Sequence, residues 1–175
     1  MTSRIILTFL AAILAAGCGF AWKTPRPGTT DAGTPPAVLS FYADRLIRPG
    51  ETWRVYLKVE DVDCDMTYVV TDMRPSGGSP FPVSFTPISG HPCPDLVGYL
   101  FLRTPTDQSL MSDGFEIKIS VRDRRGNSSK SVSLPLNFDM VSSTEPPKQW
   151  QAPEVVAIGA IQIDLADYRR TDSGR

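Results

Sequence analysis

The sequence predicts an all-β protein built as an antiparallel β-sandwich of about seven strands, and three observations lead to this prediction. Between residues 37 and 138, apolar side chains recur at every second position in short segments, which is the period of a half-buried strand. Turn residues separate these segments at intervals of roughly 10–15 residues, as in sandwich folds. The chain also holds 16 prolines and 13 glycines in 175 residues, which argues against a helical bundle.

The N-terminal stretch, MTSRIILTFLAAILAAGC, predicts a secretory signal peptide over residues 1–17. Arg4 precedes an apolar run from Ile5 to Ala16, and small residues then lead to Cys18. As a helix this run would span about 18 Å, well short of the roughly 30 Å core of a bilayer. A cleaved signal is therefore favoured over a transmembrane helix.

The end of this stretch, LAAGC from Leu14 to Cys18, resembles the lipobox of bacterial lipoproteins. The resemblance implies that Cys18 becomes the first residue of the mature chain and carries the lipid, which anchors the protein to a membrane. Gly19 stands where inner-membrane retention often uses Asp, so the resemblance favours the outer membrane. The alternative is ordinary signal cleavage that leaves Cys18 free or removes it.

Residues 18–36 are rich in Pro, Gly and Thr and are expected to form a tether. A proline-rich chain extends by about 3.1 Å per residue, so this tether would hold a domain up to about 55 Å from the bilayer.

The strands are expected in one domain, residues 37–140. Their apolar faces must pack on a second sheet, because each strand alternates between apolar and mixed positions. The segment 81–88 contains prolines and is suited to a sheet edge. The expected strands are 37–43, 52–60, 66–73, 81–88, 96–102, 115–123 and 130–138.

Two stretches, RPGETWRVYLKVEDVDCDMTYVV and GFEIKISVRDRRGNSSKSVSLPL, resemble bacterial immunoglobulin-like domains of the PKD and cadherin-like kind. The resemblance covers residues 37–138 and implies an immunoglobulin-like sandwich. It departs from the PKD pattern after the acidic loop, where only Tyr68 stands in place of an aromatic pair. The calcium motifs of cadherins are also incomplete here, so the resemblance does not carry metal binding over.

The three cysteines predict one disulfide bond. If Cys18 is lipidated, Cys64 and Cys93 remain as an even pair in an oxidising compartment. When the strands reverse direction in turn, the loops that hold these two residues lie at the same pole of the sandwich, as a bridge requires. The alternative is a pair of buried free thiols.

A cluster of acidic residues follows the strand 52–60, whose inward-facing positions are odd-numbered. Continued, this phase would bury Asp61, Asp63 and Asp65, and unpaired buried carboxylates are costly. We therefore expect the strand to end near Glu60 and the acids to turn outward. By the same argument Asp123 must lie at the end of its strand, which places Asp123 and Asn127 at this pole too.

Two interpretations of the cluster remain open. Five oxygen-bearing side chains at one pole match the ligand preference of Ca²⁺, and the candidate ligands are Asp61, Asp63, Asp65, Asp123 and Asn127. Alternatively, the Asp side chains cap tight turns by accepting backbone N–H groups, and Arg124 and Arg125 neutralise them. No cofactor is expected on the second interpretation, and Ca²⁺ alone on the first.

The sequence does not predict an enzyme or a nucleic-acid-binding protein. The chain has one histidine, His91, in a loop, and it has no glycine-rich phosphate loop. With 18 basic and 19 acidic residues the chain is close to neutral, so nothing favours binding to phosphate backbones.

Residues 141–175 are expected to form a linker and a C-terminal extension. Alternating apolar residues between 155 and 165 fit an extra strand, with two possible partners. The strand either folds back on the edge of its own domain or adds to the sheet edge of a partner protein. In the second case the partner-binding residues would be Trp150, Ile161, Ile163 and Leu165.

Together these patterns predict a lipid-anchored module of the bacterial cell envelope that binds or supports another envelope protein and has no catalytic activity. The alternative prediction is a calcium-stabilised adhesion or carbohydrate-binding module.

Overall fold

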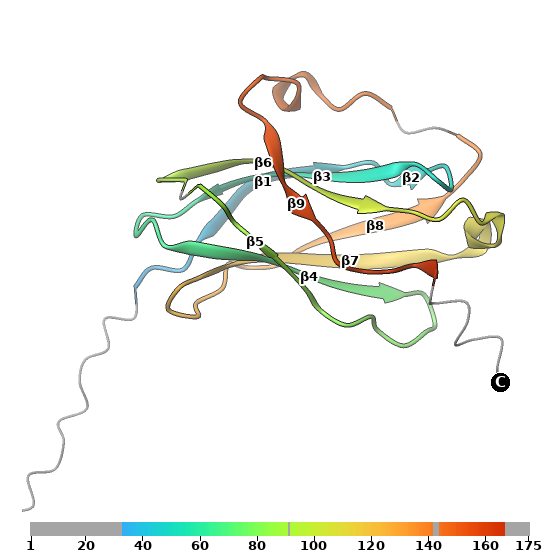
Figure 1. Cartoon of the computed structure of the whole chain (residues 1–175), viewed down its shortest axis with the longest axis horizontal. Coiled ribbons are helices and arrows are strands. Elements are labelled where there is room, and N and C mark those ends of the chain that lie inside the picture. The colour runs from blue at the N-terminus through green and yellow to red at the C-terminus, as the bar shows by residue number, and fades with distance from the viewer. Residues whose placement is uncertain (1–32, 91, 142–143, 167–175) are drawn as a thin grey trace, which may run out of the picture. The chain divides into compact units, whose positions relative to one another are not determined.

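The structure, a computed structural model, describes residues 33–90, 92–141 and 144–166. Two β-sheets pack face to face as an immunoglobulin-like sandwich (Figure 1). Most, but not all, of the strands that follow one another along the chain lie in different sheets, as in Greek-key sandwiches. The fold class predicted from alternation is therefore confirmed.

One sheet has four strands in the order β1-β3-β6-β9. Strands β1, β3 and β6 pair antiparallel, whereas β9 runs parallel to β6. The bounds of these strands are β1 Ala37–Ala43, β3 Thr52–Glu60, β6 Asp95–Arg103 and β9 Val156–Ala160.

The other sheet has five strands in the order β2-β8-β7-β4-β5. Strand β2 runs parallel to β8, and the remaining neighbours are antiparallel. The bounds are β2 Leu46–Ile47, β4 Met66–Pro75, β5 Ser84–Pro87, β7 Gly114–Asp123 and β8 Val132–Phe138, and the two short 3-10 helices are η1 Gln108–Ser112 and η2 Lys148–Trp150.

All seven expected strands are present, and each sheet contains in addition one parallel pair, β2 with β8 and β9 with β6, which the sequence did not predict. After β1 the chain crosses to the other sheet and lays the two-residue β2 along β8. After β8 it passes over the four-stranded sheet before β9 begins (Figure 1), so β9 arrives in the same direction as β6. The sandwich thus extends beyond residue 140.

Alternation places the core as expected. In β3 the odd positions Trp53, Val55, Leu57 and Val59 are buried, and in β7 the buried apolar positions are Phe115, Ile117, Ile119 and Val121. Tyr56 is an exception, because it lies on the outward phase of β3 and is still only 7% exposed. The ring of Trp150 covers it, with the two ring centroids 5.7 Å apart.

The C-terminal segment folds back on its own domain. Trp150, Ile161, Ile163 and Leu165 are all buried, and the last three belong to the hydrophobic core. The four side chains that the partner-edge interpretation would leave for another protein therefore lie inside this domain. Burial in the core is the more favourable outcome for these side chains, because it removes their apolar surface from water and does not require a second protein.

Strand β5 is an edge strand, as its prolines predicted, and β9 closes the sandwich beside it. The hydroxyl of Thr86 donates to the carbonyl of Ala160 at 2.9 Å, and the amide of Gln162 donates to the hydroxyl of Ser84 at 2.8 Å. These bonds join the two sheets along one side. In the ranges 33–90, 92–141 and 144–166, no helix is long and apolar enough to cross a membrane.

Candidate functional site

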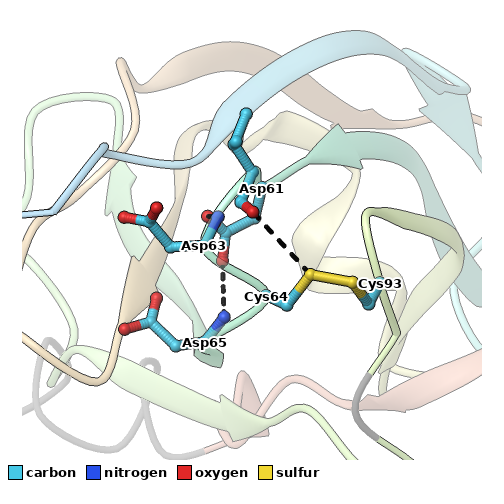
Figure 2. The surroundings of a disulfide bond; sticks show 6 residues. Asp61, Asp63, Cys64, Asp65 and Cys93 are labelled. Carbon is cyan, nitrogen blue, oxygen red and sulfur yellow. Dashed lines mark hydrogen bonds between the residues drawn. A yellow bond between two sulfur atoms is a disulfide. The ribbon is translucent and has the colours of Figure 1, made fainter.

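Three loops meet at one end of the sandwich, which we call the disulfide pole: residues 61–65 between β3 and β4, residues 88–94 between β5 and β6, and residues 124–131 between β7 and β8 (Figure 1). The predicted bond between Cys64 and Cys93 is confirmed, with the two Cα atoms 5.0 Å apart (Figure 2). Backbone hydrogen bonds join the same loops, from the Asp61 amide to the Pro94 carbonyl at 2.8 Å and from the Arg124 amide to the Asp65 carbonyl at 2.9 Å. The pole is thus cross-linked both covalently and through its backbone.

Asp61 lies at the centre of the β3–β4 loop. Strand β3 ends at Glu60, as expected, but the expectation that Asp61 turns outward was wrong, because this residue is 1% exposed. Its Oδ2 accepts the amide of Asp65 at 2.9 Å, and its Oδ1 accepts the amide of Asp63 at 3.3 Å. The sequence argument treated a buried carboxylate as unpaired, whereas the loop that follows supplies the backbone donors that make its burial tolerable.

Asp123 plays the same part in the β7–β8 turn. It is the last residue of β7, as predicted, and is 2% exposed. Its Oδ1 accepts the backbone amide of Asn127 at 2.7 Å, and its Oδ2 accepts the side-chain amide of Asn127 at the same distance. Gly126, with φ at 92°, provides the left-handed residue that the turn requires.

Asp63 and Asp65 face the β7–β8 loop. Their carboxylates point in the same direction, away from the disulfide (Figure 2). Arg125 reaches both: its Nη1 lies 3.6 Å from Oδ2 of Asp63, and its Nε lies 3.7 Å from Oδ2 of Asp65. The guanidinium group therefore neutralises the acids by a shared ion pair, as one of the two sequence interpretations proposed.

The pKa of Asp65 is raised above the ordinary value of an aspartate. Burial is the largest cause, and the negative charges of Asp123 and Asp61 add to it, while Arg125 acts in the opposite direction. One carboxylate oxygen of Asp65, Oδ1, is buried and has no hydrogen-bond partner within the described ranges. Burial without a full set of hydrogen-bond partners consequently favours the protonated form of the Asp65 carboxyl.

The structure brings all five predicted calcium ligands to the disulfide pole, yet their oxygens are largely engaged by backbone amides, by Asn127 and by Arg125. Within the part of the chain that is described, no group of three or more His, Cys, Asp and Glu side chains is arranged to hold a metal ion. Turn capping accounts for the positions of Asp61 and Asp123. The contacts described here are explained without a bound calcium ion, and calcium binding stays a prediction.

The chain enters the sandwich at this same pole. The amide of Thr34 donates to Oδ2 of Asp63. Gly33 has φ at 63°, and a Cβ there would collide with the guanidinium of Arg125. Sequence reasoning missed this contact, because nothing in the spacing of the residues links the tether to Arg125. Lipidation of Cys18, the signal peptide over 1–17 and the loop histidine His91 lie outside the described residues.

Comparison with known proteins gives little beyond the fold. No protein-family model matches the sequence, and no curated protein matches it. Among solved structures, the chain is similar to a CARDB domain from Pyrococcus furiosus, described as a complex with di-metal ions. The identity is 10%, the alignment covers 59% of this chain and 87% of that chain, and the TM-score is 0.33. The strand order, rather than this likeness, defines the immunoglobulin-like sandwich.

Proposed function

We propose that the chain is a lipid-anchored module of the bacterial cell envelope that binds or supports another envelope protein and catalyses no reaction. The observation that carries the proposal is the sequence LAAGC, which places Cys18 directly after an apolar signal and before a proline-rich stretch. Acylation of Cys18 would hold the domain at a membrane surface through that stretch.

The contacts of residues 33 and 34 support this arrangement. Because Thr34 bonds to Asp63 and Gly33 packs on Arg125, the chain is held at the disulfide pole where it enters the sandwich.

Metabolic labelling with a fatty acid tests the anchor. We expect the wild-type chain to take up label and to sediment with membranes, and the Cys18→Ser chain to lose both properties. A Cys93→Ser chain is the matched control, because it loses a cysteine without touching the anchor. Equal labelling of the wild-type and Cys18→Ser chains, or no labelling of either, would contradict the proposal.

Cross-linking in intact cells tests the binding role. We expect the wild-type chain to form a defined adduct with another envelope protein, whose amount falls when the Cys18→Ser chain is released from the membrane. A chain that forms no adduct under any cross-linking condition would argue against an interaction module.

A further inference from the structure

The segment 144–154, which we call the strap, passes over the outer face of the four-stranded sheet on its way from β8 to β9 (Figure 1). Both of its flanks are fixed to the sandwich. Before it, the amide of Asp139 donates to the carbonyl of Ile47 at 2.9 Å, and after it β9 pairs with β6, beginning with Val156 opposite Gly98. The strap is therefore an excursion between two fixed points.

Few contacts hold the strap itself. Trp150 is its one buried residue, at 4% exposed, and every other residue of the strap is exposed or half-buried. The backbone hydrogen bond from the Trp150 amide to the Pro147 carbonyl, at 2.8 Å, stays within the strap. Within the described ranges, the strap bonds to the rest of the domain through the Thr144 hydroxyl, which donates to Oδ1 of Asp44 at 3.1 Å.

The Trp150 ring lies on a group of tyrosines that is separate from the interior of the sandwich. Its centroid is 5.7 Å from that of Tyr56, which in turn lies 6.1 Å from Tyr42 and 5.6 Å from Tyr99. None of these four residues belongs to the hydrophobic core cluster between the two sheets. Lifting Trp150 away would therefore expose the tyrosines and leave the core packing intact.

The indole N–H of Trp150 makes the closed position less favourable than the burial of its ring suggests. Its Nε1 is buried and has no hydrogen-bond partner within the described ranges. Trp53 differs, because its Nε1 donates to the carbonyl of Asp44 at 2.7 Å. A buried donor without an acceptor has lost its hydrogen bond to water. Opening of the strap returns that bond to Trp150 and so offsets part of the cost of exposing its ring.

We propose that the strap is a lid that opens locally, with the contact between Trp150 and Tyr56 holding it closed, while both sheets stay folded. Segments with few buried contacts open at a lower free energy than the core. Opening uncovers Tyr56 together with Tyr42 and Tyr99, and the fixed flanks limit it to the strap. The inference depends neither on lipidation of the chain nor on a partner.

Hydrogen exchange of the indole N–H groups, followed by NMR in the full chain with labelled tryptophan, tests the proposal. A Trp22→Phe background leaves two signals, Trp53 and Trp150, which are 1% and 4% exposed. If the domain opened only as a whole, both groups would exchange at the same rate. We expect Trp150 to exchange at least about 100-fold faster than Trp53, because local opening precedes global unfolding.

A variant of the lid contact separates opening from the entry of water into a closed domain. Tyr56→Leu removes the ring on which Trp150 rests, and aromatic pairs contribute about 0.5–1.5 kcal/mol, so the Trp150 rate should rise by about 3–10-fold relative to the Trp53 rate. Tyr68→Leu is the matched control, since Tyr68 is 42% exposed on the other sheet, and it should leave the ratio of the two rates unchanged.

Two results would overturn the inference. Equal exchange of the two indole groups in the chain with Tyr56 intact would mean that the strap opens only when the whole domain unfolds, and this comparison decides even if Tyr56→Leu does not fold. Fast exchange of Trp150 whose ratio to Trp53 is the same in Tyr56→Leu would mean that water reaches the indole without lifting the strap.

Discussion

The buried carboxylate of Asp61 offers the sharpest test of how the disulfide pole is held. Replacing Asp61 by alanine removes both oxygens that accept the amides of Asp63 and Asp65, and leaves those amides without their acceptor in a site that is 1% exposed. The bond at 2.9 Å has good length, whereas the bond at 3.3 Å exceeds the usual range. Hydrogen bonds to charged groups contribute roughly 1.5–3 kcal/mol each, so with one strong and one weak bond we expect a loss of about 2–4 kcal/mol.

Urea unfolding of the purified domain measures this loss, from the shift in midpoint at an unchanged slope. Asp61→Asn is the matched variant, because it keeps one acceptor oxygen and similar volume, and it should lose about half as much. Each variant is measured with calcium and with a chelator. A loss that is equal in both conditions supports turn capping.

Two results would refute this reasoning. If Asp61→Ala changed the free energy of unfolding by less than about 0.5 kcal/mol, which is the range of an ordinary surface substitution, the carboxylate would not hold the loop. If the variant lost stability only when calcium was present, Asp61 would act as a metal ligand, and the calcium-stabilised module would become the better interpretation.

Three further predictions concern stability. The pKa of Asp65 is raised in the folded state, so the folded state binds this proton more tightly than the unfolded state, and the free energy of unfolding falls as pH rises between the ordinary pKa of 3.8 and the raised value. Asp65→Asn should reduce this fall in urea titrations at a series of pH values. An identical pH dependence in the variant would contradict the assignment. Reducing the bond between Cys64 and Cys93, which are 29 residues apart, should cost about 3–4 kcal/mol in the chain-entropy model, measurable as a lower midpoint with a reductant and absent from a Cys93→Ser chain. Ile163→Ala should lower the free energy of unfolding of the purified chain by about 2–4 kcal/mol, because Ile163 lies in the core. Val156→Ala is the control and should lower it by under about 0.5 kcal/mol, because Val156 is 58% exposed. Equal losses in the two variants would mean that the C-terminal segment does not pack on the domain.

Alternation predicted the larger part of the fold because it reflects burial on one face of each strand. Positions such as Val55 and Ile117 are specified by a period of two, and the cystine followed from the direction in which the strands must turn. Neither inference needs knowledge of which strand pairs with which.

The remainder depends on contacts between distant segments, which periodicity does not encode. The expected strand between residues 155 and 165 forms only over Val156–Ala160, and the alternately buried Ile161, Ile163 and Leu165 follow it. Whether β9 pairs parallel to β6 depends on the path of the chain over the sheet. Alternation predicts that Tyr56 is exposed, whereas the structure buries its ring against Trp150. Asp61 was predicted to be exposed because the sequence argument did not consider that backbone amides of its own loop donate hydrogen bonds to its carboxylate.

The late position of β9 has a consequence for biogenesis. Ile161, Ile163 and Leu165 fill the interior, and they follow every other strand along the chain. During synthesis, all the strands before β9 are made before these three core side chains. The hydrophobic interior is therefore completed only when the segment that ends at Leu165 becomes available, so the last part of the chain to be made is required for the final packing of the first.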